Sequence, residues 1–172
     1  KREFVKKIAR EKKDLLHDFV TILKRKKIRF CIIGGLGVNA YAEPVVSLDL
    51  DIVIIVDRLL ELLASLRHGY KIKKYANSIN ISSRFSDLRI QIQTDKRYQD
   101  FIRDAAYKDV LGYKLPVARI EDVLQGKIWA AQDKTRRASK RQKDLADILR
   151  LIEIKKSLAS LIPYSLKKKI GL

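Results

Sequence analysis

The stretch GGLGVNAYAEPVVSLDLDIVI, residues 34–54, ends one apolar run with two glycines and opens the next with two aspartates. Asp49 and Asp51 are two residues apart, so on a β-strand both side chains point to the same face, while Leu50 and Ile52 point to the other. Two carboxylates held this close repel each other unless a cation lies between them or one keeps its proton. The stretch therefore predicts a strand whose acidic face meets a positively charged partner.

A divalent cation that carries phosphate fits this acidic face. Mg²⁺ binds oxygen ligands and is commonly held by one or two carboxylates together with phosphate oxygens of a substrate. Gly34 and Gly35 suit such a substrate, because a glycine turn lets the backbone approach a phosphate closely and N–H groups at a helix start can receive its oxygens. The alternative is that Asp49 and Asp51 are solvated on an edge strand or paired with nearby lysines and arginines.

A second glycine pattern in the same stretch competes with this interpretation. Gly35, Gly37 and Ala40 match the dinucleotide-binding pattern G-x-G-x-x-G/A, and Asp57 follows about twenty residues later. A crossover between parallel strands needs a dozen or more residues, usually a complete helix, and Pro44 ends this helical segment after about two turns. We therefore do not expect a dinucleotide-binding unit.

Hydrophobic periodicity around this stretch predicts an α/β fold of the mixed α+β kind, a small mixed sheet flanked by helices and followed by a helical C-terminal half. Helical spacing is found at residues 3–27, 58–69, 96–107, 120–132 and 139–162, with Ser139 as the N-cap of the last. Strand patterns are found at residues 28–35, 47–57, 70–75, 77–82 and 87–94, and residues 111–119 form a short extended piece. With no proline-rich or glycine-rich linker, a core of residues 1–95 and a helical subdomain of residues 96–172 are expected to pack as one body.

The net charge is the strongest compositional signal. The 172 residues include 38 Lys and Arg against 20 Asp and Glu, which gives a formal charge of +18. Such an excess favours a polyanionic partner, either nucleic acid, nucleotide phosphates or an acidic protein. No apolar stretch has the length of a membrane span, and Cys31, the single cysteine, cannot form an internal disulfide. These features predict a cytoplasmic protein with no membrane partner.

Two glycines followed by an Asp-apolar-Asp strand resemble the signature of the nucleotidyltransferase superfamily, which has the DNA polymerase beta-like fold. The matching residues are Ile33, Gly34 and Gly35, followed by Asp49, Leu50, Asp51 and Ile52. Residues 121–153 are similar to the C-terminal part of AbiEii-type nucleotidyltransferases, which show a helix with a lysine, a basic loop, and a Lys-Asp pair followed three residues later by a second Asp. The matching residues there are Lys127, Lys143, Asp144 and Asp147.

The resemblance implies roles for these residues. Catalytic roles are implied for Asp49, Asp51, Lys143 and Asp144, with Mg²⁺ or Mn²⁺ on the first two and Asp144 orienting a lysine or the acceptor. Contacts to a nucleoside triphosphate are implied for Gly34, Gly35, Ser47, Lys127 and Lys143. The basic residues Arg136, Arg137, Lys140 and Arg141 would hold a nucleic-acid backbone or, equally, the triphosphate. As alternatives, Lys127 could be a solvated lysine, and Lys143 could pair with Asp147 on a helix surface.

The implied function is the metal-dependent transfer of a nucleoside monophosphate from a triphosphate to an acceptor hydroxyl on tRNA, another RNA or a protein. The AbiEii-type resemblance adds a role as the toxin of a toxin–antitoxin pair, with an acidic antitoxin as partner. One position departs from the superfamily pattern, because Gln91 stands where a third carboxylate is common on the neighbouring strand. This departure leaves three alternatives: one main metal ion, a different base, or a catalytically weak or inactive nucleotide- or nucleic-acid-binding protein of the same fold.

Overall fold

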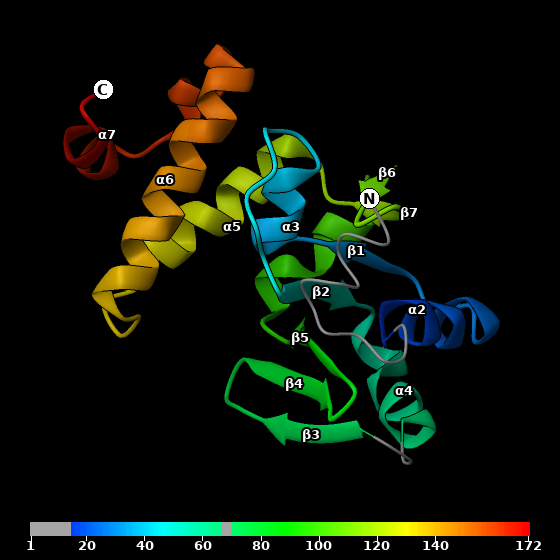
Figure 1. Ribbon diagram of the computed structural model, residues 1–172. Helices are drawn as coiled ribbons and strands as arrows, with labels where there is room; N and C mark the ends of the chain where they lie inside the picture. The colour runs from blue at the N-terminus through cyan, green and yellow to red at the C-terminus, as the bar shows by residue number, and fades with distance from the viewer. Residues whose placement is uncertain (1–14, 67–69) are drawn as a thin grey trace.

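The computed structural model describes residues 15–66 and 70–172, and a seven-stranded sheet forms its centre (Figure 1). The strand order is β3-β4-β5-β2-β1-β7-β6. The strands are β1 (Phe30–Ile32), β2 (Asp49–Ile54), β3 (Tyr70–Lys74), β4 (Ser78–Ser83), β5 (Ser86–Gln93), β6 (Ala106–Val110) and β7 (Tyr113–Val117). β3, β4 and β5 form an antiparallel meander, β6 and β7 form a hairpin, and β2 and β1 join the two groups.

The pairing at the centre of the sheet brings the glycines to the aspartates. β1 pairs antiparallel with β2, with Ile32 opposite Ile52, so the end of β1 and the start of β2 lie at the same edge. β2 pairs parallel with β5, and Asp51 lies opposite Gln91. A dinucleotide-binding unit joins its first two strands in parallel, so the antiparallel pairing confirms that the second glycine pattern does not form one.

Two sets of helices cover the two faces of the sheet (Figure 1). α2 (Leu15–Arg25) and α4 (Leu59–Ser65) pack on the face that carries Leu50 and Ile52. α3 (Gly34–Asn39) and α5 (Ile120–Gln132) pack on the opposite face, and α6 (Ala138–Ile154) and α7 (Tyr164–Ile170) belong to the same hydrophobic cluster. Three short 3₁₀ segments are η1 (Val56–Arg58), η2 (Lys96–Ile102) and η3 (Lys156–Leu161). Asp49 and Asp51 alternate with Leu50 and Ile52, so they face the layer of α3, α5 and α6.

The mixed α/β fold class and the predicted strands are confirmed, and two helical predictions need correction. Residues 96–107 were expected to form one helix, but η2 ends at Ile102 and β6 begins at Ala106. The buried side chains of η2 recur three and four residues apart, which is a spacing that α-helices share with 3₁₀ turns. α6 begins before Ser139, with Arg137 at its N-cap position and no side-chain cap, and it ends at Ile154 rather than at residue 162. Residues 3–14 of the first predicted helix and the helix end expected at Gly69 lie outside the described residues.

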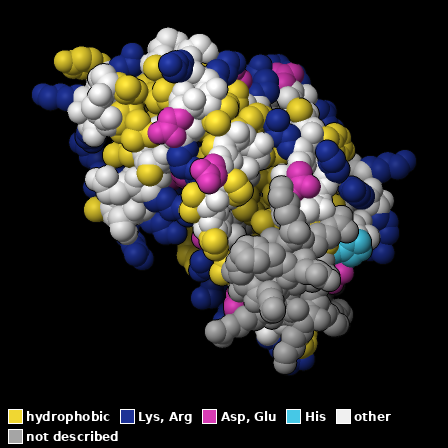
Figure 2. All heavy atoms as spheres, turned by 45° about the horizontal axis from the view of Figure 1, so that its top comes forward, with side chains coloured by type: hydrophobic (Ala, Val, Ile, Leu, Met, Phe, Trp, Pro, Cys, Tyr) yellow, Lys and Arg dark blue, Asp and Glu magenta, His cyan; other side chains and the backbone are white. Residues whose placement is uncertain are grey.

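The surface of the protein is basic, in line with the net charge of +18. Figure 2 shows Lys and Arg side chains spread over one face and around its outline, with Asp and Glu more scattered. None of the helices within residues 15–66 and 70–172 is both long and apolar enough to cross a membrane. The division into residues 1–95 and 96–172 stays a prediction, and residues 106–117 after that boundary add two strands to the sheet.

Candidate active site

The glycine turn after β1 is pressed against Asp51 at the start of β2. The Ile33 N–H donates to the Asp51 carbonyl at 2.9 Å, and Gly34 has a φ of +63°. A Cβ placed on Gly34 would overlap the Asp51 carboxylate, so only glycine fits both the left-handed backbone and the space. Gly35 is less restricted, because a Cβ there would lie 3.4 Å from the Ser47 Oγ. The first glycine of the pair is therefore required by the carboxylate that it touches.

Asp51 lines a cleft of about 480 Å³ between the sheet and α5. Burial is the main cause that raises the pKa of Asp51 from 3.8 to about 6, the charge of Lys127 opposes the rise, and Asp49 adds to it. The backbone N–H of Gly35 and the charge of Arg136 also favour the ionised form. A cation that enters the cleft would stabilise the ionised form of this desolvated carboxylate.

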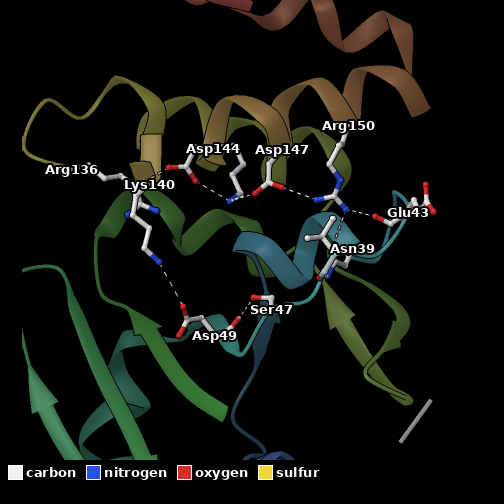
Figure 3. Close-up of polar contacts among 11 residues, drawn as sticks. Asn39, Glu43, Ser47, Asp49, Arg136, Lys140, Asp144, Asp147 and Arg150 are labelled. Atoms are coloured by element: carbon white, nitrogen blue, oxygen red, sulfur yellow. Dashed lines mark hydrogen bonds and ion pairs between the residues drawn. The ribbon is translucent and has the colours of Figure 1, made fainter. Parts of the chain in front are cut away.

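Asp49 lies on the same face of β2 as Asp51 and is contacted by cations from two other elements, of which Figure 3 shows Lys140. Arg89 of β5 places its Nη2 2.8 Å from the Asp49 Oδ1, and the Nζ of Lys140 on α6 lies 4.0 Å from the Oδ2. The Ser47 hydroxyl donates to the Asp49 backbone carbonyl at 3.3 Å. The structure thus places the two aspartates on one face of a strand inside the sheet, and it pairs Asp49 with nearby basic residues, which was the second part of the alternative.

Gln91 fills the position where the superfamily resemblance leads one to expect a third carboxylate. It lies directly opposite Asp51 in the parallel pairing of β2 and β5, and its side chain lines the same cleft. Within residues 15–66 and 70–172, no group of three or more His, Cys, Asp and Glu side chains is placed to hold a metal ion. Asp49 and Asp51 are the two carboxylates on this face that one Mg²⁺ or Mn²⁺ could use, because Mg²⁺ needs only one or two carboxylates when phosphate oxygens and water supply its other ligands.

A buried charge network lies between α5 and α6, on the far wall of the cleft (Figure 3). Lys127 is 7% exposed, and its Nζ lies 3.0 Å from the Asp144 Oδ1 and 2.6 Å from the Asp147 Oδ2. Arg136 contacts the Asp144 Oδ2 at 2.7 Å, and Arg150 contacts the Asp147 Oδ1 at 2.7 Å. The network alternates cation and anion along its whole length, so each of the two buried carboxylates is paired on both oxygens.

The balance of the network keeps Lys127 charged. Burial alone would lower the pKa of Lys127, but the charges of Asp147 and Asp144 and their hydrogen bonds outweigh it and raise the pKa above 10.5. Lys127 is therefore not a solvated lysine, and Asp147 pairs with Lys127 and Arg150 rather than with Lys143.

Arg150 and Asn39 form a contact beside the site that the sequence did not indicate. The Arg150 Nη2 donates to the Asn39 Oδ1 at 2.9 Å and to the Glu43 carbonyl, and the Asn39 amide in turn donates to the Val45 carbonyl at 2.6 Å. These contacts attach the loop of residues 40–48 to α6. Because this loop leads into β2, Arg150 fixes the approach to Asp49. The i, i+3 spacing of Asp147 and Arg150 was a local signal, but it gives no hint of the loop.

Aromatic residues form a further wall of the cleft. Tyr98 and Trp129 pack edge to face at 5.1 Å between ring centroids, and the Arg97 guanidinium lies 4.7 Å from the Trp129 centroid. Asp95 holds this guanidinium through its Oδ2 at 2.9 Å from the Nε and 2.7 Å from the Nη2. Trp129 is half-buried, packs against the second hydrophobic cluster and lines the cleft together with Arg97.

The structure brings some of the predicted site residues to the cleft and leaves others beside it. Among the described residues, the predicted ones that line the cleft are Gly34, Asp51, Lys127, Arg136 and Asp144. Those that lie outside its wall are Gly35, Ser47, Asp49, Arg137, Lys140, Arg141 and Lys143. Lys143 and Arg137 are exposed, Arg141 is half-buried, and Lys140 reaches Asp49. The assigned roles of all these residues stay predictions.

Solved structures, among them an adenylyltransferase, share the fold of this chain. A solution structure of the antibiotic-resistance factor ANT(2'')-Ia covers 91% of both chains with a TM-score of 0.66 at 13% identity. A crystal structure of ANT(2'')-Ia in complex with adenylyl-2''-tobramycin covers 85% of this chain and 95% of that one, with a TM-score of 0.57 at 14% identity. The lincosamide antibiotic adenylyltransferase LnuA, with lincomycin bound, covers 79% of this chain and 95% of its own, with a TM-score of 0.52 at 14% identity.

These similarities concern structure alone. No protein-family model matches the sequence, and no curated protein matches it. At identities of 13–14%, the structural likeness establishes the fold, and the AbiEii-type resemblance is not confirmed by it.

Proposed function

We propose that the protein is a nucleotidyltransferase that moves a nucleoside monophosphate from a triphosphate to an acceptor hydroxyl. The observation that carries the proposal is the arrangement of Asp51 in the cleft, with the turn of Gly34 against it and Arg136 on the opposite wall. A desolvated carboxylate, a glycine turn where the backbone can approach closely and a guanidinium are groups that suit a metal-bound triphosphate.

In the proposed reaction, the acceptor oxygen forms a bond to the α-phosphorus as the bond from that phosphorus to the bridging oxygen breaks. The leaving group is pyrophosphate, and the acceptor proton passes to solvent or to a base that we do not assign. Asp49 and Asp51 would hold Mg²⁺ or Mn²⁺, which neutralises phosphate charge when bound. The Gly34–Gly35 turn would receive phosphate oxygens, and Arg136 would contact them from α6's side of the cleft. Asp144 would orient Arg136 and Lys127, which both contact it.

RNA, such as the acceptor end of tRNA, is the acceptor that the charge favours. A net charge of +18 attracts a polyanion, and Arg136, Arg137, Lys140 and Arg141 lie on the loop and helix that border the cleft. A protein hydroxyl is the second acceptor class. If the AbiEii-type resemblance holds, the reaction would serve as the toxic activity of a toxin–antitoxin pair, and the basic surface would also bind an acidic antitoxin.

The second candidate function is a protein of the same fold that binds nucleotide or nucleic acid without turnover. Gln91 favours this candidate, because an amide cannot supply the negative charge of a third carboxylate beside Asp51. The two candidates differ in whether a covalent product forms.

Incubation with each labelled triphosphate, Mg²⁺ or Mn²⁺ and total tRNA, or a protein lysate in parallel, tests the proposal. We expect label transfer from one triphosphate, its loss in Asp51→Asn, and its retention in Lys168→Gln, which removes a charge on α7 away from the cleft. Thermal stabilisation by a triphosphate without any transfer would reject the enzyme and support the binding protein. Stabilisation by neither nucleotide nor RNA would reject both.

A further inference from the structure

We propose that Arg89 and Lys140 are exchangeable counter-ions of Asp49, which occupy its carboxylate until a metal–nucleotide complex binds and then transfer to the phosphates of that complex. The inference rests on the proposed function for the identity of the ligand, a divalent cation carried by a polyphosphate. It assigns to Arg89 a role in metal and nucleotide binding that neither the glycine turn nor the acidic strand indicates.

The geometry gives each oxygen of Asp49 its own cation. Arg89 lies directly opposite Asp49 in the pairing of β2 and β5, so its side chain rises from the same sheet face and reaches the Oδ1 at 2.8 Å. Lys140 descends from α6 on the other side of the cleft mouth and approaches the Oδ2 at 4.0 Å (Figure 3). A divalent cation that used Asp49 as a ligand would have to displace one of the two, since both compete for the same lone pairs.

Arg89 and Lys140 can both move away from Asp49 into solvent. The Arg89 side chain is 62% exposed and the Lys140 side chain 47% exposed, so both move into solvent without losing buried contacts. Ion pairs this exposed contribute little to folding, and their exchange for another anion therefore costs little. Phosphate is the anion that suits them, because a guanidinium binds two phosphate oxygens at once and an ammonium binds them as a point charge.

The charge of this sheet face supports one divalent ion rather than two. Asp49 and Asp51 supply two negative charges, Arg89 and Lys140 offset part of them, and Gln91 adds none where a third carboxylate would stand. Two divalent ions on this face would meet uncompensated positive charge. A single ion that brings the negative charge of a triphosphate is compensated, because the phosphates also accept Arg89 and Lys140. Metal and nucleotide are therefore expected to bind cooperatively, each poorly alone.

Mn²⁺ binding tests this inference without turnover. Free Mn²⁺ is measured by electron paramagnetic resonance during titration of the protein, alone and with a non-hydrolysable nucleoside triphosphate. For the wild type we expect Mn²⁺ to bind at least tenfold more tightly with nucleotide than without. For Arg89→Gln we expect Mn²⁺ alone to bind about tenfold more tightly than to the wild type, the size of effect that removing one screened unit charge about 4 Å from a divalent ion produces.

Matched variants separate a local effect from net charge. Lys168→Gln removes the same charge from α7 and should leave Mn²⁺ binding within twofold of the wild type, and Arg89→Lys keeps the local charge and should do the same. Gln91→Asp should raise the number of bound Mn²⁺ ions from one towards two with nucleotide present. If Arg89→Gln does not fold, as judged by circular dichroism, Lys140→Gln on the exposed side of α6 gives the same comparison with a smaller expected change.

The outcomes distinguish this inference from the proposed function. The inference is overturned if Arg89→Gln and Lys140→Gln both bind Mn²⁺ within twofold of the wild-type affinity. This holds even if label transfer to an acceptor is observed. Equal Mn²⁺ affinity of the wild type with and without nucleotide overturns it as well. Tighter Mn²⁺ binding in Arg89→Gln without any label transfer would support the inference and reject the enzyme.

Discussion

Replacing Lys127 by methionine removes the central cation of the buried network and nearly preserves the volume of the side chain. The variant leaves Asp144 and Asp147, which are 1% and 2% exposed, with one arginine partner each and one unpaired oxygen each. Methionine fits the apolar part of the site, so the loss of the charge contacts is what the variant measures.

The magnitude follows from opposing contributions. At an effective dielectric constant of about 20, contacts of 3.0 and 2.6 Å are each worth about 5–6 kcal/mol before desolvation. The variant also removes the cost of burying the Lys127 charge, which is several kcal/mol. Arg136 and Arg150 still pair with the two carboxylates in the variant. We expect a net loss of about 3 kcal/mol in the free energy of unfolding, at the lower end for a broken buried ion pair. In a protein of this size, that loss corresponds to about 6–12 °C in Tm.

Urea denaturation followed by circular dichroism measures this loss, with Lys143→Met on the exposed side of α6 as a control that should change stability by less than about 0.5 kcal/mol. The double variant Lys127→Met/Asp147→Asn should lose less stability than the two single variants added together, by about 1 kcal/mol or more. The reason is that Asp147→Asn removes one of the two buried negative charges that Lys127→Met leaves unpaired. The pKa of Lys127 is raised in the folded state, so its contribution is complete below 10.5 and declines as pH rises beyond that value. A loss below about 1 kcal/mol at pH 7, or additive losses in the double variant, would refute the reasoning.

Three further predictions concern other parts of the site. Gly34→Ala should lower stability by about 2 kcal/mol or more and weaken nucleotide binding, because the new Cβ would overlap Asp51 and the φ of residue 34 is positive. Gly35→Ala should change stability by less than about 0.5 kcal/mol, and equal losses for the two variants in calorimetry would contradict this. Burial, with the charge of a nearby aspartate, raises the pKa of Cys31 to about 12, so the native protein should not react with a thiol reagent at pH 8 except through unfolding, and rapid native labelling would count against the described core. Arg150→Ala should increase hydrogen exchange in the loop before β2 and cost about 1–2 kcal/mol, while unchanged exchange there would show that this loop is held by other contacts.

The acidic strand and its glycine turn could be predicted from the sequence because both are local patterns. A period of two places Asp49 and Asp51 on one face, and the resemblance to the superfamily pattern singled out Gln91. The pairing of Arg89 with Asp49 could not be predicted in this way, because it depends on the register of two strands about 40 residues apart in the chain.

The contacts that could not be predicted from the sequence join elements that are far apart in the chain. Arg150 meets Asn39 across 111 residues, and no periodicity within α6 or α3 encodes that meeting. The error over residues 96–107 has a similar cause, since η2 buries its aromatic side chains in the second hydrophobic cluster and β6 pairs with β7, so tertiary contacts outweigh helical spacing.

Helix α6 contacts the segment before the acidic strand at both of its ends, through Arg150 at Asn39 and through Lys140 at Asp49. The contact at Asn39 ties the segment to α6, whereas the contact of Lys140 at 4.0 Å is exposed and easily exchanged. A fragment cut near residue 95 would retain both aspartates but lose Arg150, which attaches the segment before them to α6. The proposed nucleotide site therefore needs a portion of the chain that extends into α6, whose buried Asp144 lines the cleft.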